Sequence, residues 1–305
     1  MIAYRKHNKQ DWLEITLLTQ APNVTRFEQA LSELGAQAIT LRDSADDAIY
    51  EPHPEDSPLW VTTQVTGLFD TTHDQQYLLS ALADRLGPQS IKAATIRSFN
   101  DRPWEREWLV YFKPQRYGMH LWVAPSGYEH PDGQSAIVRL DPGLAFGTGT
   151  HPTTAMCLTW LDQAQLDGKT VIDYGCGSGI LSIAAIKLGA QQVTAVDHDP
   201  QALLATTSNA TANKVSIRLS ALAPDDLATG AVDILLANIL SGTLIGLART
   251  FSGRVKPGGH IILSGILHDQ CNAVKEAYTR WFTIDDEYTS EEWVLLVGRR
   301  RPALR

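Results

Sequence analysis

The residues with the clearest chemical pattern lie in the segment TVIDYGCGSGILS, at positions 170–182. An apolar stretch ends in Asp173 and is followed by a turn that contains Gly175, Gly177 and Gly179. Apolar residues then continue at helical spacing. Glycine allows the backbone to pass close beneath a ligand and to adopt a positive φ, and a helix N-terminus presents free N–H groups. The segment therefore predicts a site for a nucleotide-like ligand.

The same segment departs from the dinucleotide-binding fingerprint. That fingerprint requires glycine at position 180, where Ile180 stands, and the carboxylate of Asp173 would repel a pyrophosphate. A carboxylate at this place suits a ligand with a positive ammonium or sulfonium group, and S-adenosylmethionine carries both. The alternative is that Asp173 only caps a turn or helix. We expect Asp173 and the three glycines to bind S-adenosylmethionine.

A second carboxylate ends the next predicted strand, at positions 193–197. Asp197 follows Gly175 by 22 residues. In doubly wound folds an acidic residue at the tip of the second strand accepts hydrogen bonds from the two ribose hydroxyls. We therefore predict that Asp197 binds the ribose. Asp199 precedes Pro200, and we expect it to open the following helix.

Upstream, the segment LDPGLAFGTGTHPTT at positions 140–154 combines a glycine-rich loop with the start of a helix. Pro152 suits a first helical position, and Thr153 and Thr154 then lie where the helix dipole stabilises a carboxylate. The methionine carboxylate of the donor would fit beside Thr154. The alternative is that the threonines only cap the helix. We interpret His151 as a hydrogen-bonding support in preference to a base.

The segment ILLANIL, at positions 234–240, is the fourth candidate element. Its strand ends at Asn238, before a predicted helix from Ser241. Because central strands point their carboxyl ends at the ligand crevice, Asn238 is expected to face the methyl group. Its amide oxygen can accept a hydrogen bond from an incoming amine and so orient the nitrogen. Helix capping is the alternative, which Ser241 could also perform. We predict Asn238 as the catalytic residue, without a dedicated base.

The surrounding pattern predicts an α/β fold for the second part of the chain. From about position 118, β-branched runs alternate with helical stretches, which predicts a parallel sheet covered by helices on both faces. The candidate strands lie at 170–173, 193–197, 215–219, 232–237, 260–264, 282–288 and 293–298. The terminal segment RRRPALR is expected to be a frayed tail.

The first hundred residues predict a different, smaller fold. Strands are expected at 13–18, from 39, at 59–65 and at 91–96, with helices around 27–34 and 78–86. This order is that of the ferredoxin-like α+β sandwich, which says little about function by itself. The segment DRPWEREWLVYF, at 101–112, is expected to be a linking helix. We therefore predict domains at 1–99 and 118–305, joined by a linker at 100–117.

Composition excludes several classes of protein. The 305 residues carry a formal net charge of −8, which argues against nonspecific binding of nucleic acid. No apolar run approaches the length of a membrane helix, and MIAYRKHNKQ lacks the apolar core of a secretory signal. Three scattered cysteines are too few for a disulfide framework or a zinc site. We expect a cytoplasmic protein without a metal.

Acidic residues are concentrated in one segment. Positions 43–84 contain no Lys or Arg. The acidic residues there are Asp43, Asp46, Asp47, Glu51, Glu55, Asp56, Asp70, Asp74 and Asp84. We interpret the segment as a solvated face, with a docking surface for a cationic partner as the alternative.

Taken together, the motifs resemble one family. LDPGLAFGTGTHPTT, VIDYGCGSGILSIAA, VDHDPQA, ANIL and SGIL, with WEREW and EEWVLL, resemble the bacterial ribosomal protein L11 methyltransferase (PrmA) family almost from end to end. The resemblance implies a substrate-recognition domain, a linking helix and a class I methyltransferase domain with a doubly wound, seven-stranded sheet. It also implies trimethylation of the N-terminal α-amine and lysine ε-amines of ribosomal protein L11, free or on the ribosome. The family's donor-binding positions fall on Thr154, Gly175, Asp197 and Asn238.

Two other functional classes compete with this interpretation. Nucleic-acid N-methyltransferases usually carry Asn-Pro-Pro-aromatic after the fourth strand, whereas this chain has Asn238, Ile239 and Leu240 there. A module that binds the donor without turnover is the other class, and the complete set of motifs argues against it. The arginine-rich tail and the first ten residues depart from the resemblance and leave the contact with ribosome or substrate open.

Overall fold

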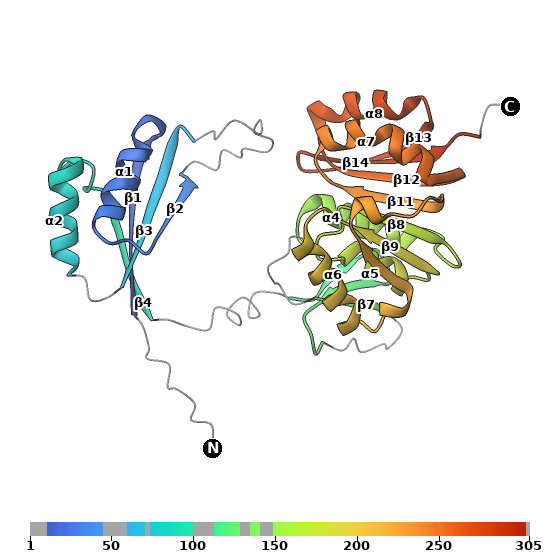
Figure 1. The fold of residues 1–305 in the computed structure, drawn as a ribbon, viewed down its shortest axis with the longest axis horizontal. Coiled ribbons are helices and arrows are strands. Elements are labelled where there is room, and N and C mark those ends of the chain that lie inside the picture. The colour runs from blue at the N-terminus through green and yellow to red at the C-terminus, as the bar shows by residue number, and fades with distance from the viewer. Residues whose placement is uncertain are drawn as a thin grey trace, which may run out of the picture. The chain divides into compact units, whose positions relative to one another are not determined.

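The computed structural model describes residues 11–44, 60–70, 74–100, 113–128, 135–140 and 149–302. The chain divides into two compact units, Met1–Trp104 and Glu105–Arg305 (Figure 1). The predicted linking helix at 101–112 lies outside the described residues, so the linker and its boundaries stay a prediction. Each unit is described by itself below.

The first unit is an antiparallel sheet with two helices. Its elements are β1 (Asp11–Gln20), α1 (Val24–Glu33), β2 (Ala38–Asp43), β3 (Thr62–Asp70), α2 (Gln75–Leu86) and β4 (Thr95–Asn100). The strand order is β2-β3-β1-β4. This is the predicted ferredoxin-like arrangement. The last strand begins four residues later than predicted, because Ile91 packs against the core from a turn in which Ala94 N–H donates to Ile91 O.

Buried and less buried residues alternate along β1, and this pattern shows which face of the sheet the two helices cover. Leu13, Ile15 and Leu17 are buried against α1 and α2. The residues between them point to the other face, on which no helix of the described residues packs. That face carries a shallow groove of about 380 Å³. It is lined by Trp12, Glu14, Ala38, Thr40, Thr66, Leu68 and Phe99.

The second unit is built on a seven-stranded sheet in the order β10-β9-β8-β11-β12-β14-β13. The strands are β8 (Thr170–Tyr174), β9 (Gln192–Val196), β10 (Leu219–Leu222), β11 (Val232–Asn238), β12 (Val255–Leu267), β13 (Phe282–Ser290) and β14 (Trp293–Arg300). The predicted α/β sheet is confirmed, but it is not wholly parallel. β14 runs antiparallel to both of its neighbours. The two residues between β13 and β14 can only join antiparallel strands.

Helices cover both faces of this sheet, as a doubly wound fold requires (Figure 1). They are α4 (Pro152–Gln163), α5 (Ile180–Lys187), α6 (Pro200–Ala212), α7 (Ser241–Arg254) and α8 (Cys271–Thr279). One apolar cluster contains buried residues of α4, α5 and α6, and the other contains those of α7 and α8. Seven of the eight residues of α5 are buried, so this helix lies deepest in the unit.

Two parts of the second unit differ from the sequence-based expectation. The strand predicted at 215–219 is a 3-10 helix at Ser216–Arg218, and β10 begins only at Leu219. The apolar Ile217 that suggested a strand is fully exposed. A small sheet of β5 (Gln115–Tyr117), β6 (Leu121–Ala124) and β7 (Ala136–Arg139) was not predicted. Its buried residues join the cluster formed by α4 and α5.

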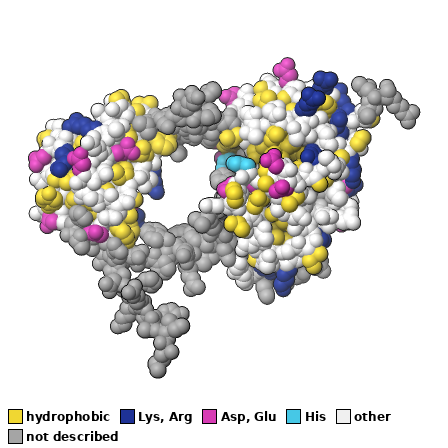
Figure 2. Space-filling view, in the orientation of Figure 1, with side chains coloured by type: hydrophobic (Ala, Val, Ile, Leu, Met, Phe, Trp, Pro, Cys, Tyr) yellow, Lys and Arg dark blue, Asp and Glu magenta, His cyan; other side chains and the backbone are white. Residues whose placement is uncertain are grey.

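The predicted frayed tail is wrong as far as Arg301. Arg299 and Arg300 belong to β14, and Arg300 donates to Ser252 O and Trp281 O, both at 2.9 Å. Arg301 donates to Phe282 O at 3.2 Å. Figure 2 shows Lys and Arg side chains gathered on this part of the second unit. The guanidinium groups therefore fasten the last strand to α7 and β13.

Among the described helices, none combines the length and hydrophobicity needed to cross a bilayer.

Candidate active site

The predicted site residues meet at one edge of the large sheet. Asp173 lies in β8, Asp197 directly follows β9, and Asn238 ends β11. β8 and β11 are neighbours, while the chain runs from β8 outward through β9 and β10 before it returns to β11. Such a reversal of strand order leaves a crevice at the carboxyl ends of the strands, where ligands bind in open α/β sheets. The three residues therefore lie at the edge of the sheet where this topology places the ligand crevice, and this region is called the crevice below.

The glycine turn after β8 has the conformation that its sequence predicts. Gly175, Gly177 and Gly179 have φ values of 79°, 52° and 77°. A Cβ atom on Gly175 would lie 2.2 Å from Cγ2 of Ile239. Gly175 N–H and Cys176 N–H donate to Val196 O at 2.7 and 3.1 Å. The turn is thus held between β9 and the end of β11, with a backbone that only glycine adopts without strain.

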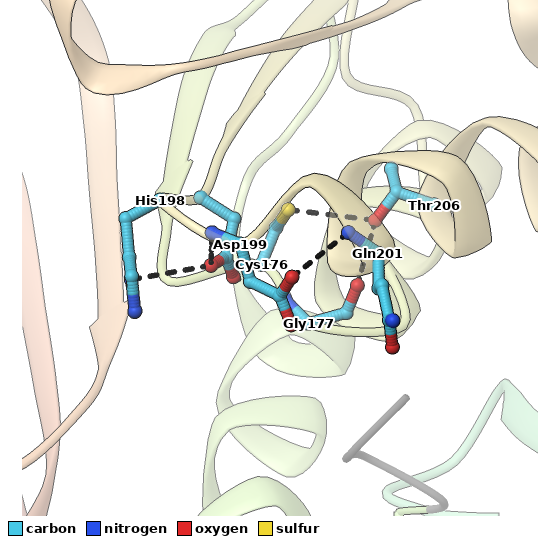
Figure 3. A network of polar contacts seen from close by, with 7 residues as sticks. Cys176, Gly177, His198, Asp199, Gln201 and Thr206 are labelled. Atoms are coloured by element: carbon cyan, nitrogen blue, oxygen red, sulfur yellow. Dashed lines mark hydrogen bonds and ion pairs between the residues drawn. The ribbon is translucent and has the colours of Figure 1, made fainter. Parts of the chain in front are cut away.

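Asp197 connects this turn to the end of β9. Figure 3 shows Gly177, His198 and Asp199 in the same network of polar contacts. Its Oδ2 accepts from Gly177 N–H at 2.9 Å and its Oδ1 accepts from Asp199 N–H at 3.0 Å. The Asp197 side chain is 10% exposed, whereas His198, whose Nδ1 lies 3.5 Å from Asp197 Oδ1, is 93% exposed. Asp199 caps α6 by accepting from Gln201 N–H, as predicted. The carboxylate of Asp197 therefore lies at the crevice, and its role toward a ribose stays a prediction.

Asp173 has the structural role that the sequence left open as an alternative, and its role toward a ligand stays a prediction. Its Oδ2 accepts from Ser182 N–H at 3.0 Å and from Ser182 Oγ at 2.7 Å, as a structural carboxylate does. Its Oδ1 is buried and has no hydrogen-bond partner among the described residues. Burial raises the pKa of Asp173 to about 6, against the opposing effect of the Ser182 hydrogen bonds. A buried oxygen without a partner is costly, and a ligand ammonium group would satisfy it.

The raised pKa of Asp173 predicts a pH-dependent loss of stability in the donor-free protein. Its folded-state pKa of about 6 lies above the ordinary 3.8, so its contribution is fully present below pH 3.8 and is lost as the pH rises through 6. Asp173→Asn does not titrate. We expect its free energy of unfolding, relative to the parent, to increase by about 3 kcal/mol between pH 4 and pH 8. Urea unfolding at four pH values measures this difference, and a flat difference would contradict it.

Thr154 and Asn238 are in contact although they are 84 residues apart in the chain. Asn238 Nδ2 donates to Thr154 Oγ1 at 3.2 Å, and Thr154 is buried. The amide oxygen of Asn238 is then the atom left to accept from an incoming amine. The start of α4 and the end of β11 thus form one wall of the crevice. Gly143 and Gly147, in the loop that precedes α4, lie outside the described residues.

His151 caps α4, so the alternative in which the threonines perform the capping is wrong. His151 Nδ1 accepts from Thr153 N–H at 3.4 Å and lies 2.7 Å from Thr153 Oγ1. The His151 ring also packs edge-on against Trp293 at a centroid distance of 5.0 Å. His151 is therefore the hydrogen-bonding support that the sequence predicts. Trp293 was not singled out, because no local pattern connects it to position 151.

The described residues offer no metal site and no reactive thiol. No group of three His, Cys, Asp or Glu among them could hold a metal ion. Cys157, Cys176 and Cys271 are free and buried, and burial raises the pKa of both Cys157 and Cys176 to about 12. These two thiols stay protonated at neutral pH and are poor nucleophiles.

A second cavity, of about 460 Å³, lies at the opposite edge of the same sheet. Asp233 and Lys256 are among its lining residues, and their side chains are 3.0 Å apart. Burial acts to raise the pKa of Asp233, but hydrogen bonds from Thr170 and Lys256 outweigh it and lower the pKa to about 2. The carboxylate is therefore already satisfied. None of the predicted site residues lines this cavity.

Comparison with known proteins gives a consistent result over nearly the whole chain. The family model described as "Ribosomal protein L11 methyltransferase (PrmA)" matches residues 11–301. A protein named ribosomal protein L11 methyltransferase from Nitrosococcus oceani is 47% identical over 95% of this chain and 99% of its own length. A protein of the same name from Marinobacter nauticus is 45% identical over 95% of this chain and 99% of its own length.

A solved structure agrees with these relatives. The crystal structure of a ribosomal protein L11 methylase from Lactobacillus delbrueckii subsp. bulgaricus is 32% identical to this chain, with a TM-score of 0.58. The match covers 63% of this chain and 100% of that one. The likeness therefore holds for fold as well as for sequence.

Proposed function

Because the chain belongs to the ribosomal protein L11 methyltransferase family, we propose that it transfers methyl groups from S-adenosylmethionine to ribosomal protein L11. The acceptors in this proposal are the N-terminal α-amine and lysine ε-amines, up to trimethylation. The observation that carries the proposal is the convergence of Asp173, Asp197 and the Thr154–Asn238 pair on one crevice. A ribosomal protein as acceptor also places the reaction in the cytoplasm.

The crevice residues fit the parts of S-adenosylmethionine. Asp197 offers paired acceptors for the ribose hydroxyls, and the glycine turn allows the donor to pass close to the backbone. The partnerless Oδ1 of Asp173 suits the ammonium group, and the N-terminus of α4 beside Thr154 suits the carboxylate. When bound, the donor supplies a methyl group on a positively charged sulfur. The protein has to hold it in line with the acceptor.

Asn238 orients the acceptor amine in this proposal. Its amide oxygen accepts an N–H, which directs the nitrogen lone pair at the methyl group. The attacking amine must be neutral, which at pH 7 costs about 4.6 kcal/mol for a lysine and about 1 kcal/mol for an α-amine. Desolvation in the crevice lowers the pKa of an amine and so reduces that cost. A dedicated base is not required.

We assign substrate recognition to the sheet face of the first unit on which no described helix packs. Trp12 and Phe99 are directly paired across β1 and β4 on that face, beside the groove. Aromatic side chains in a groove are the residues that most often dominate protein interfaces. The acid-rich segment 43–84 in the same unit complements a partner that offers lysine residues.

Trp12→Ala is expected to raise the KM for L11 by about tenfold, because it removes an aromatic contact from the docking face. The donor Kd is expected to stay unchanged, since Trp12 is not among the residues assigned to donor binding. Tyr77→Ala is the matched control, because Tyr77 is 64% exposed on α2, away from this face. Steady-state kinetics with both substrates measures the effect. Equal KM values for Trp12→Ala and Tyr77→Ala would exclude this face as the docking site.

The proposed function is tested directly by incubating the protein with labelled S-adenosylmethionine and purified L11, followed by mass spectrometry of L11. Methyl groups on the α-amine and on lysines are expected. Comparison of free L11 with whole large subunits identifies the preferred form of the substrate. Label in RNA would instead indicate a nucleic-acid methyltransferase. Donor binding without transfer to any fraction would indicate a binding module.

A further inference from the structure

The segment SGIL at positions 264–267 has no role in the site as described so far, yet it contacts both the start of α4 and the end of β11, which form one wall of the crevice. Ser264 is fully buried and lies directly opposite Asn238 in the pairing of β11 with β12. Ser264 O accepts from Ile239 N–H at 3.2 Å. Ser264 Oγ donates to Thr153 O at 3.3 Å. Ser264 thus joins the start of α4, through its side chain, to the residue after Asn238, through its backbone oxygen.

Gly265 brings the same strand against Ile239. Its φ is 82°, and a Cβ atom there would lie 2.4 Å from Ile239 O and 2.9 Å from Ile239 C. The Ile239 side chain in turn lies against Gly175 of the glycine turn. Ile239 is therefore held between Gly175 of the glycine turn and Gly265 of β12. Any side chain at position 265 would push it away.

The pairing of β12 with β14 shows a matching irregularity. Its register shifts between Leu263 and Ile266, at the position of Ser264 and Gly265. Irregularities of this kind bend a strand and re-aim side chains, and they are frequent next to active sites. Here the shift lies at the carboxyl end of β12, level with Asn238 on the neighbouring strand.

We propose that Ser264 and Gly265 are positioning residues that set the distance between Asn238 and the methyl donor. They act through Ile239 and Thr153 and touch neither reactant. Because methyl transfer depends on alignment, a displacement of Asn238 lowers the rate of transfer more than it affects binding. This inference rests on the proposed function, which supplies the reaction whose rate is measured.

Gly265→Ala tests the close approach to Ile239. We expect kcat to fall by about tenfold or more, with the donor Kd changed by less than about threefold. Gly258→Ala is the matched control. Gly258 lies in the same strand with a φ of 79°, but nothing is within 4 Å of a Cβ atom there. Gly258→Ala introduces a similar backbone strain without a contact with Ile239, and its kcat is expected to equal that of the parent protein.

Ser264→Ala tests the second contact and serves where Gly265→Ala does not fold. It removes only the hydroxyl that joins Thr153, and we expect a fall in kcat of about fivefold at constant donor Kd. Calorimetry gives the donor Kd, single-turnover methylation of L11 gives the rate, and thermal unfolding shows whether the variant is folded.

The two hypotheses fail in different ways. A parent protein that does not methylate L11 overturns the proposed function. A parent that does, together with a folded Gly265→Ala that equals Gly258→Ala in kcat, overturns the positioning role. A Ser264→Ala variant that changes only the unfolding temperature, or that weakens donor binding as much as it lowers kcat, also overturns it.

Discussion

Replacing Asn238 with alanine is expected to lower the rate of methyl transfer by about 100-fold, because the acceptor amine loses the group that orients it. Donor affinity is expected to stay within about threefold of the parent, since Asn238 contacts Thr154 by its nitrogen and offers its oxygen to the acceptor. Single-turnover transfer to L11 measures the first quantity, and calorimetry with S-adenosylmethionine measures the second.

The hydrogen bond to Thr154 gives this experiment its control. Thr154→Val keeps the shape of the side chain but removes the hydroxyl that accepts from Asn238 Nδ2. If Asn238 acts on the amine, Thr154→Val lowers the rate less than Asn238→Ala does. If rate and donor affinity fall equally in Asn238→Ala, the residue only builds the pocket and its catalytic role is refuted.

Asp197→Ala is expected to weaken the binding of S-adenosylmethionine by about 100-fold. The carboxylate offers charge-assisted hydrogen bonds to two ribose hydroxyls, each worth about 1.5–3 kcal/mol. The change also leaves Gly177 N–H without its acceptor, so the glycine turn loses part of its support. Calorimetry measures the donor Kd directly, and saturation with donor should recover much of the lost activity.

Asp199 provides the neighbouring comparison for this experiment. It lies two residues from Asp197 and caps α6 by accepting from Gln201 N–H at 2.9 Å. Asp199→Ala is expected to cost about 1 kcal/mol in the free energy of unfolding. The donor Kd should change little. If both aspartate variants weaken donor binding to the same extent, Asp197 has no special role toward the ribose.

The placement of Asp173, Asp197 and Asn238 was predictable from sequence because each lies at or next to the carboxyl end of a strand. The apolar runs before Asp173, Asp197 and Asn238 mark three strands, and the carboxyl ends of parallel strands meet at one edge. Positive φ at the glycines followed from the G-x-G-x-G spacing. Residues that are far apart in the chain could thus be assigned to one crevice without knowledge of their contacts.

Contacts that no local pattern encodes could not be predicted. The hydrogen bond from Ser264 to Thr153 joins residues 111 positions apart. His151 caps α4 with a ring nitrogen, which is outside the usual preference for Ser, Thr, Asp and Asn. The direction of β14 could not be predicted either, because its run of buried residues has the same pattern in a parallel strand and in an antiparallel one. The exposed Ile217 shows that an apolar residue alone does not mark a strand.

The backbone hydrogen bonds from Gly175 and Cys176 to Val196 fasten the glycine turn to the end of β9. If the donor binds over this turn, as proposed, these bonds hold the turn in place beforehand, and little conformational entropy has to be given up when the donor arrives. Turnover needs the spent donor to leave again, and a rigid floor allows this exchange without refolding of the turn. In the proposed function, each further methyl group would then need only the exchange of one small molecule, while the turn keeps its conformation.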